Sequence, residues 1–478
     1  MRSLLLSGQH SCALAAKSRR SLRSVATRTA LGTSQQTVPA EEKPAYSRWA
    51  EDQQSGANVS GSSSCGTMFI NSHFDSGNVE IVDISDPSNI QLAIHRDPFC
   101  ETDQKAHFQW FHFRVTGVRS TPLTLHMVNA GEASYPNAWE GYSACASYDL
   151  SHWFRVPTAY DKASGALTIT HTPEKDAVHY AYFAPYSLER HAQLVHRMQC
   201  KDRVRLHMIG ETLDGHDMDL LQVRATVAGP LSFQARLPSG SDTCRTRLTR
   251  WVSTGEGKRV VWVIARQHPG ESMAEWFAEG LLERLTDPHD ATSRALLDKA
   301  VFYVVPNMNP DGSWRGHLRV NAQGSNLNRC WAAPTLAASP EVHHTLAKMA
   351  QTGVDMMVDV HGDEELPYVF IAGNAGIPEW SSVQNDLQNS FLNAFKRASP
   401  EFQTKFGYAE DKPGQANLTL ASKAVGARFG CLAVTLEMPF KDATDLPEPL
   451  QGWSPERSSR LGAAMLGAVL EVLPALRP

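Results

Sequence analysis

Two regions of the chain differ in the spacing of their apolar residues. From residue 67 to residue 186, short segments rich in Val, Ile, Thr and aromatic residues alternate with polar, turn-forming residues. These segments lie at residues 77–84, 110–118, 123–128, 166–172 and 178–183. Apolar residues at every second position are typical of strands with one buried face. Because no long helical pattern interrupts them, residues 67–186 are predicted to form a small antiparallel β-sandwich.

Residues 187–478 instead alternate between continuous apolar runs and helical patterns. In chain order, runs and helices are predicted at residues 259–266, 272–285, 300–306, 341–351, 355–360, 368–372, 380–395, 432–436 and 455–473. Continuous apolar runs are typical of strands that are buried on both faces, as in parallel sheets. The predicted fold is therefore α/β: a mixed, mainly parallel sheet with flanking helices, preceded by the β-sandwich.

The first forty residues have a different composition from the rest of the chain. They contain six Lys or Arg residues, many Ser and Ala, and no acidic residue. This composition is typical of an organelle transit peptide, and the apolar run at residues 4–6 is too short for a secretory signal. We therefore expect import into the mitochondrion, with the plastid, or a cytoplasmic protein with a basic tail, as alternatives. Residues 41–66, with clustered Ser and Gly, are predicted to be a linker.

Composition and charge narrow the classes of function. The 478 residues are 42% hydrophobic and 20% charged, as in ordinary globular proteins, and no run of 18 apolar residues predicts a membrane span. A formal net charge of −5, which becomes −11 when the six basic residues of positions 1–40 are left out, argues against nucleic acid as a partner. The eight Cys residues form no CxxC pair, which argues against a cysteine zinc site and favours a reducing compartment. The oligomeric state is not indicated.

Candidate metal ligands lie at the ends of two predicted strands. His268 and Glu271 stand in a turn between an apolar strand and a helix, and His361 ends a second apolar strand. A catalytic zinc site needs three such protein ligands and one open position, and ligands gather at the carboxyl ends of strands. A capped turn without metal remains an alternative. Other possible ligands near His361 are Asp359, Asp363, Glu364 and Glu365.

Further polar residues have the chemistry that a hydrolase requires. Glu437 follows five mostly apolar residues, where a charge is costly unless it is used or paired, so it is a candidate proton carrier. Its alternative role is a structural salt bridge. Between the candidate ligands, Arg319, Asn328 and Arg329 provide donors suited to a carboxylate, and Arg319 could instead stabilise an oxyanion.

The order of the motifs resembles that of a known family. HPGE (268–271), NPDG (309–312), R-x₄-G-x-x-L-N-R-x-W (319–331), DVHG (359–362) and TLEMPFKD (435–442) resemble the zinc metallocarboxypeptidases. The cytosolic carboxypeptidase branch, with its tubulin-processing enzymes and bacterial relatives, is the most similar. The resemblance extends from residue 67 to the C-terminus, because the β-rich segment is similar to the N-terminal β-sandwich of that branch.

The resemblance implies that His268, Glu271 and His361 bind one zinc ion. The sequence departs from the family pattern close to this site. The family often has Asp two residues before the Asn-Arg pair, where it orients the first zinc histidine, and here that residue is Asn326. The amide oxygen of Asn326 can still accept the imidazole N–H but brings no negative charge, so zinc affinity is the property at risk.

The resemblance also implies roles in catalysis and substrate binding. Glu437 would be general base and acid, Arg319 would polarise the scissile carbonyl, and Asn328 and Arg329 would bind the substrate's terminal carboxylate. Lys423 resembles a basic position of the deglutamylating members, which would favour C-terminal Glu; the alternative is that it lies on a solvated helix face. The expected activity is removal of the C-terminal residue from peptides or proteins.

Several alternatives remain open at this point. One is a zinc amidohydrolase of the acylase type, which shares the H-x-x-E…H ligands but cleaves small N-acyl amino acids. A catalytically silent binding module is disfavoured, because all three ligands and Glu437 are present. For the family's mobile active-site tyrosine, the candidates are Tyr408 and Tyr368.

Overall fold

The computed structural model describes residues 61–62, 67–100, 106–225 and 257–476. The predicted transit peptide at residues 1–40 lies outside the described residues, as does most of the predicted linker at residues 41–66. Among the helices of these described residues, none has both the length and the hydropathy that a membrane span requires.

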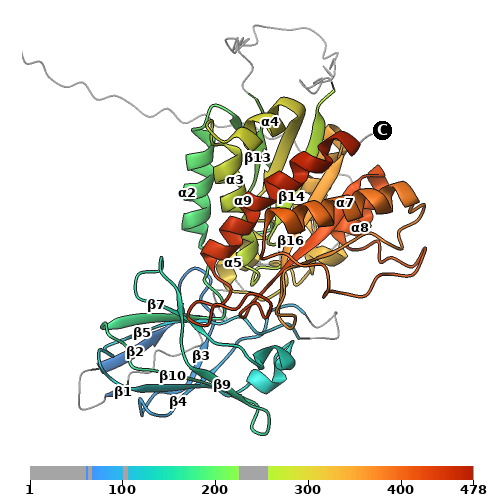
Figure 1. Ribbon diagram of the computed structural model, residues 1–478. Coiled ribbons are helices and arrows are strands. Elements are labelled where there is room, and N and C mark those ends of the chain that lie inside the picture. Colours follow the sequence, from blue (N-terminus) through green and yellow to red (C-terminus); the bar gives the residue numbers. More distant parts are fainter. Residues whose placement is uncertain (1–60, 63–66, 101–105, 226–256, 477–478) are drawn as a thin grey trace, which may run out of the picture. The chain divides into compact units, whose positions relative to one another are not determined.

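The predicted antiparallel β region is confirmed and consists of two sheets (Figure 1). One contains, in spatial order, β1 (Gly61–Ser62), β2 (Thr67–Asn71), β5 (His112–Thr116), β11 (Ala177–Ala181), β7 (Cys145–Ser147) and β8 (Phe154–Arg155). The other contains β3 (Glu80–Asp83), β4 (Ile90–Ala93), β6 (Leu123–Met127), β10 (Ala166–His171) and β9 (Thr158–Asp161). Pairing is antiparallel except between β4 and β6. Buried residues of both sheets belong to one apolar cluster, which is why every second residue is apolar.

The second region contains a mixed seven-stranded sheet (Figure 1). Its strands, in spatial order, are β12 (Val204–Glu211), β13 (Asp217–Val223), β15 (Ala300–Val305), β14 (Arg259–Ala265), β16 (Met356–Asp363), β18 (Leu432–Pro439) and β17 (Phe370–Ala372). The four strands from β15 to β18 are parallel, and pairing toward both edges is antiparallel. The hairpin of β12 and β13 was not predicted, because β12 has neither a continuous apolar run nor a clear alternation of buried residues.

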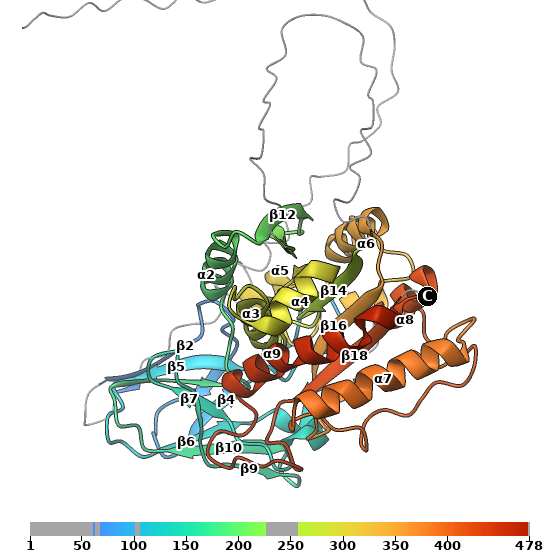
Figure 2. The ribbon, with the colours of Figure 1, turned by 45° about the horizontal axis from the view of Figure 1, so that its top comes forward.

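Helices cover both faces of this sheet. Side chains of β14 alternate between two buried clusters: Val261 and Val263 join one, and Trp262 and Ile264 join the other. The first cluster includes residues of α2 (Leu188–Gln199), α3 (Met273–Leu285), α4 (Ala291–Lys299), α7 (Ser382–Ala398) and α9 (Pro455–Val472). Figure 2 shows α3, α9 and α7 side by side. The second cluster includes residues of α6 (Pro340–Thr352) and α8 (Ala421–Phe429). Burial of both faces explains the continuous apolar runs.

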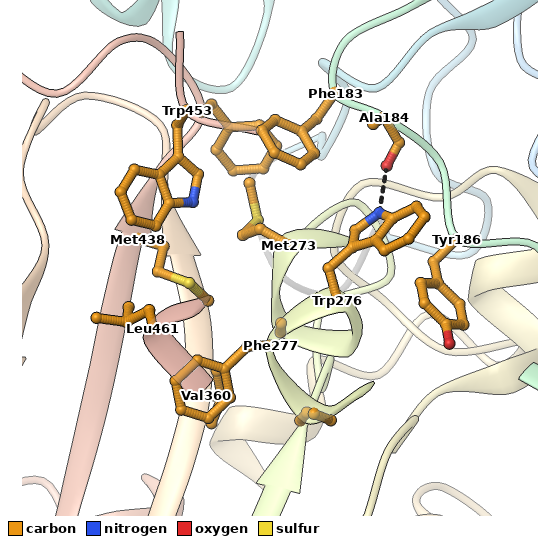
Figure 3. Close-up of a cluster of buried hydrophobic side chains, with 14 of the residues drawn as sticks. Phe183, Ala184, Tyr186, Met273, Trp276, Phe277, Val360, Met438, Trp453 and Leu461 are labelled. Atoms are coloured by element: carbon orange, nitrogen blue, oxygen red, sulfur yellow. Dashed lines mark hydrogen bonds between the residues drawn. The ribbon is translucent and has the colours of Figure 1, made fainter. Parts of the chain in front are cut away.

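The end of the β-sandwich packs directly against the α/β region. In Figure 3, Phe183 and Tyr186 lie beside α3, and the indole N–H of Trp276 donates to the carbonyl of Ala184 at 3.1 Å. Met438 of β18 belongs to the same cluster. The strand that carries Glu437 therefore has sandwich residues in its packing environment.

Candidate active site

The candidate ligands lie at the carboxyl edge of the parallel strands. His268 and Glu271 occupy the turn between β14 and α3, and His361 lies near the end of β16. In the parallel pairing of β16 with β18, His361 is the register partner of Glu437. Adjacent strand ends therefore bring together four residues that are far apart in the sequence.

The predicted ligand atoms converge on one point. His268 Nδ1 lies 2.6 Å from Glu271 Oε1, and His361 Nδ1 lies 2.7 Å from Glu271 Oε2. The two Nδ1 atoms are 3.2 Å apart, and these three residues form a group that could hold a metal ion. Burial and the nearby Arg319 lower the pKa of His268 to about 3, which favours its neutral imidazole, whereas the carboxylates of Asp359 and Glu271 outweigh burial and raise the pKa of His361 well above its usual range. Two imidazoles and one carboxylate are a donor set of catalytic zinc.

The opposite nitrogens of the two rings have different partners. His268 Nε2 donates to Asn326 Oδ1 at 3.1 Å, whereas His361 Nε2 lies 3.0 Å from the carboxylate of Asp359. Gln267 Nε2 donates to both Asp359 oxygens at 2.8 Å, which fixes their position. Asp359 therefore lies behind His361 rather than among the converging ligand atoms, and supplies the negative charge that Asn326 lacks.

The charges around the ligand group also fit a cation. Glu271, Asp363, Glu364 and Glu437 line the same cavity as three cationic side chains, those of Arg319, Arg329 and Lys423. Arg329 is exposed and Lys423 is paired with Asp411, so Arg319 is the buried guanidinium that faces these four carboxyl groups. Burial, with the nearby carboxylates, raises the pKa of Glu437 well above its usual range. Within the described part of the chain, Glu437 Oε2 is buried without a hydrogen-bond partner. A divalent cation would relieve this excess of negative charge, and a substrate or water would satisfy that oxygen.

We expect the Asp359→Asn substitution to weaken zinc binding about 10–100-fold, because such outer carboxylates orient histidine ligands and raise their basicity. Asparagine keeps an oxygen that can accept from Gln267, so the fold should be preserved. The matched variant is Asn326→Asp, which should strengthen binding and restore it in the Asp359→Asn background. Chelator competition with the apoprotein measures the affinities. Unchanged affinity in Asp359→Asn would show that the charge at this position is not used.

The remaining candidate residues surround a cavity of about 240 Å³. Arg319, Asn328, Arg329, Lys423 and Glu437 all line it, together with the three ligand residues. Asn328 and Arg329 belong to the short 3₁₀ helix η4 (Leu327–Arg329), which is capped by the Asn326 side chain. The amide N–H of Ala421 donates to Asn328 Oδ1 at 2.8 Å. The Asn328 amide is thereby oriented at the cavity wall, while Arg329 lies exposed at its rim.

The structure separates residues that the sequence left as alternatives. Asp363 and Glu364 are buried in the cavity wall outside the ligand group, and Glu365 is exposed. Tyr408 borders the cavity and its hydroxyl donates to Asp363. Tyr368 does not line the cavity but stacks on Phe406, with ring centroids 4.3 Å apart. The geometry therefore favours Tyr408 as the active-site tyrosine.

Tyr135 is a cavity residue that the sequence did not reveal. It belongs to the β-sandwich region but lines the cavity beside His268, Glu271 and Arg319. Gln109 holds its backbone on both sides, accepting from Tyr135 N at 2.8 Å and donating to Tyr135 O at 3.2 Å. No pattern in the sequence could have indicated it, because its proximity to the site depends on how the two regions pack.

A second group of side chains also meets the spacing for a shared metal ion. It consists of Asp214, His216 and Asp311. Arg315 already donates to Asp214 at 2.6 Å, and His216 Nδ1 lies 2.7 Å from Asp311. The Arg315 guanidinium already neutralises this second group, so a metal ion is not needed there. The candidate metal centre is therefore the group formed by His268, Glu271 and His361.

Two His and one Glu that could hold a metal ion, placed at the carboxyl edge of an α/β sheet, are typical of the metallohydrolases as a class. Comparison with known proteins identifies the family. Residues 192–449 match the family model described as zinc carboxypeptidase, and residues 70–183 match that of the cytosolic carboxypeptidase N-terminal domain. The chain therefore belongs to the zinc carboxypeptidase family and is a metallocarboxypeptidase, as its motifs predicted.

Individual relatives agree with the family models. The metallo-carboxypeptidases of Burkholderia cenocepacia and Pseudomonas aeruginosa are both 44% identical to this chain. Their structures match 85% of it and 99% and 100% of their own chains, with TM-scores of 0.76 and 0.75, which confirms the carboxypeptidase-like α/β fold. An uncharacterized protein of Zymomonas mobilis is 45% identical over 85% of this chain and 97% of its own. Cytosolic carboxypeptidase 1 of Xenopus laevis is 26% identical over 63% of this chain, but only 26% of that longer protein is covered.

Proposed function

We propose that this protein binds one zinc ion per chain and removes the C-terminal residue from peptides or proteins. The observation that carries the proposal is the position of Asn328 and Arg329. Both face the same small cavity as the three candidate ligands and Glu437. An arginine and an amide beside a metal centre are suited to bind a free carboxylate, which distinguishes an exopeptidase from an endopeptidase.

Each cavity residue then has a distinct task. Bound zinc would supply Lewis acidity to the carbonyl and lower the pKa of water. Glu437 would accept the proton of the attacking water at its unpartnered oxygen and pass it to the leaving amine. Arg319 would stabilise the charge that develops on the carbonyl oxygen, and Asn328 and Arg329 would hold the substrate in register.

The alternative enzyme, an acylase-type amidohydrolase, is tested with the same protein. We expect the zinc-loaded enzyme to release single free amino acids from peptides that differ only in their last residue. N-acyl amino acids, which lack a preceding peptide bond, should be poorer substrates. Mass spectrometry of the products measures both reactions. Cleavage of N-acyl amino acids alone would support the acylase and contradict the carboxypeptidase.

The same panel tests a preference for acidic ends. Lys423 Nζ donates to the carbonyls of Gly373 and Ala375 at 2.7 and 3.3 Å and pairs with Asp411 at 2.7 Å, so its three donors are engaged. Asp411 is partly exposed, and a terminal Glu would have to take its place on Lys423. We therefore expect Glu to exceed Leu in kcat/KM by only about two- to fivefold, the range of partly exposed ion pairs.

Variants at these two residues should change the preference in opposite directions. Asp411→Asn should increase the ratio of Glu to Leu cleavage, because it removes the carboxylate that competes for Lys423. Lys423→Met should bring the ratio of Glu to Leu cleavage to about one or below. A wild-type enzyme that prefers Leu or Phe would contradict the acidic preference while leaving the carboxypeptidase assignment intact.

A further inference from the structure

The β-sandwich contacts the segment that carries Arg319 through one buried carboxylate. Asp97, in the loop after β4, is 5% exposed. Its Oδ1 accepts from the backbone N–H of Leu318 at 2.7 Å. Its Oδ2 accepts from the backbone N–H groups of Arg319 and Val320 at 2.7 and 3.2 Å. Three consecutive amides of the α/β region thus converge on one side chain of the sandwich.

Other sandwich residues hold the preceding part of the same segment. Asn78 Nδ2 donates to the carbonyl of Gly316 at 2.9 Å. Gly316 has a φ of 70°, and a Cβ there would lie 2.7 Å from the carbonyl oxygen of Gly77, so only glycine fits this approach. The N–H of Ser76 donates to the carbonyl of Trp314 at 2.8 Å. The sandwich is therefore in close backbone contact with the chain just before Arg319.

Burying the Asp97 carboxylate costs desolvation free energy, which its hydrogen bonds have to offset. Burial raises the pKa of Asp97 to about 7, against the three backbone N–H groups, which favour the charged form. A polar residue of similar size could hold at most part of this arrangement, because only a carboxylate offers acceptors alone to three converging donors. The amides of residues 318–320 therefore have a defined direction, and with them the point from which the Arg319 side chain enters the cavity.

We propose that Asp97 is a positioning residue that fixes the backbone at Arg319, so that the β-sandwich forms a working part of the active site. This inference rests on the proposed function, in which Arg319 stabilises the charge on the reacting carbonyl. Tyr135, also from the sandwich region, lines the same cavity. The two residues place the sandwich on both sides of Arg319: behind its backbone and beside its side chain.

The Asp97→Asn substitution tests the proposal. The side-chain amide that replaces the carboxylate would present two N–H donors to backbone N–H groups, and the displaced backbone would shift the Arg319 guanidinium. We expect kcat to fall about 10- to 100-fold with KM within about threefold of wild type, because misplacement affects an interaction made mainly in the transition state. Zinc content should be unchanged. The matched control is Asp86→Asn, an exposed sandwich carboxylate that also accepts a backbone N–H, from Ser88 at 2.9 Å, and should leave kcat unchanged.

A double-mutant cycle separates positioning from a general loss of structure. In an Arg319→Ala background, Asp97→Asn should lower kcat by no more than about twofold, because the side chain through which it acts is already gone. Equal losses in both backgrounds would overturn the proposal, as would wild-type kcat in the single variant. If Asp97→Asn gives no folded protein, Asp97→Glu keeps the charge but displaces the backbone and should show the same fall in kcat. A wild-type enzyme without peptidase activity would instead refute the proposed function.

Discussion

Replacing Glu437 with glutamine should lower kcat by about 10²–10⁴-fold, the usual contribution of a positioned acid–base group. Glutamine has the same shape but cannot accept the proton of an attacking water. The substitution leaves the backbone pairing of Glu437 with His361 and Phe370 in place, so fold and zinc content should be retained. Steady-state kinetics on a peptide substrate, with zinc content measured on the same sample, gives the result.

The control for this prediction is a second carboxyl group in the same cavity. Glu364 is buried there as well, and burial together with the Glu271 carboxylate raises its pKa above the usual range. Glu364→Gln should lower kcat less than Glu437→Gln, because Glu437 is the register partner of His361. A larger loss in Glu364→Gln, with near-normal turnover in Glu437→Gln, would transfer the proton-carrying role to Glu364.

The sequence allowed the central sheet and the ligand positions to be predicted for one physical reason. Strands buried on both faces are recognisable as continuous apolar runs, and the polar residue that ends such a run must lie at the sheet edge. His268 and His361 were identified as candidate ligands in this way, and with Glu271 they form a group that could hold a metal ion. The alternation of side chains along a strand also predicts the position of Asp359. Residues two apart in a strand share a face, so Asp359 had to lie beside His361.

What could not be predicted depends on contacts between distant segments. Asp97 and Tyr135 precede His268 by more than a hundred residues in the sequence. Asp97 contacts backbone amides, and Tyr135 lines the cavity wall. Neither kind of partner leaves a pattern in the sequence. The ion pair of Lys423 with Asp411 is similar, because it depends on how the loop before α8 places Asp411 beside Lys423. Lys423 was correctly expected near the cavity, but its partner was not.

Amidation of a substrate's C-terminus should lower kcat/KM roughly 30- to several thousand-fold, which corresponds to the 2–5 kcal/mol of an unpaired buried charge. Arg329 is exposed in the free protein, and a bound peptide would cover it, so its interaction with the terminal carboxylate would be formed out of water. The amide neither carries the charge nor matches the two parallel acceptors that the guanidinium fork requires. The side-chain N–H of Asn328, whose amide is oriented by Ala421, can still donate to the oxygen of the substrate's terminal amide, so some binding should remain.

Substitution of Arg329 separates this interaction from the rest of the site. Arg329→Ala should bring free-acid and amidated peptides to similar kcat/KM values, because neither would then meet a cation. Arg329→Lys keeps the charge but loses the fork, and should retain an intermediate preference for the free acid. Matched pairs of peptides that differ only in the terminal group give the ratio for each variant. If the unmutated enzyme cleaves both members of a pair equally, recognition of a free C-terminus is contradicted. If the unmutated enzyme prefers the free acid and Arg329→Ala keeps the full preference, another cation of the cavity binds the carboxylate. Arg319 is then the residue to test.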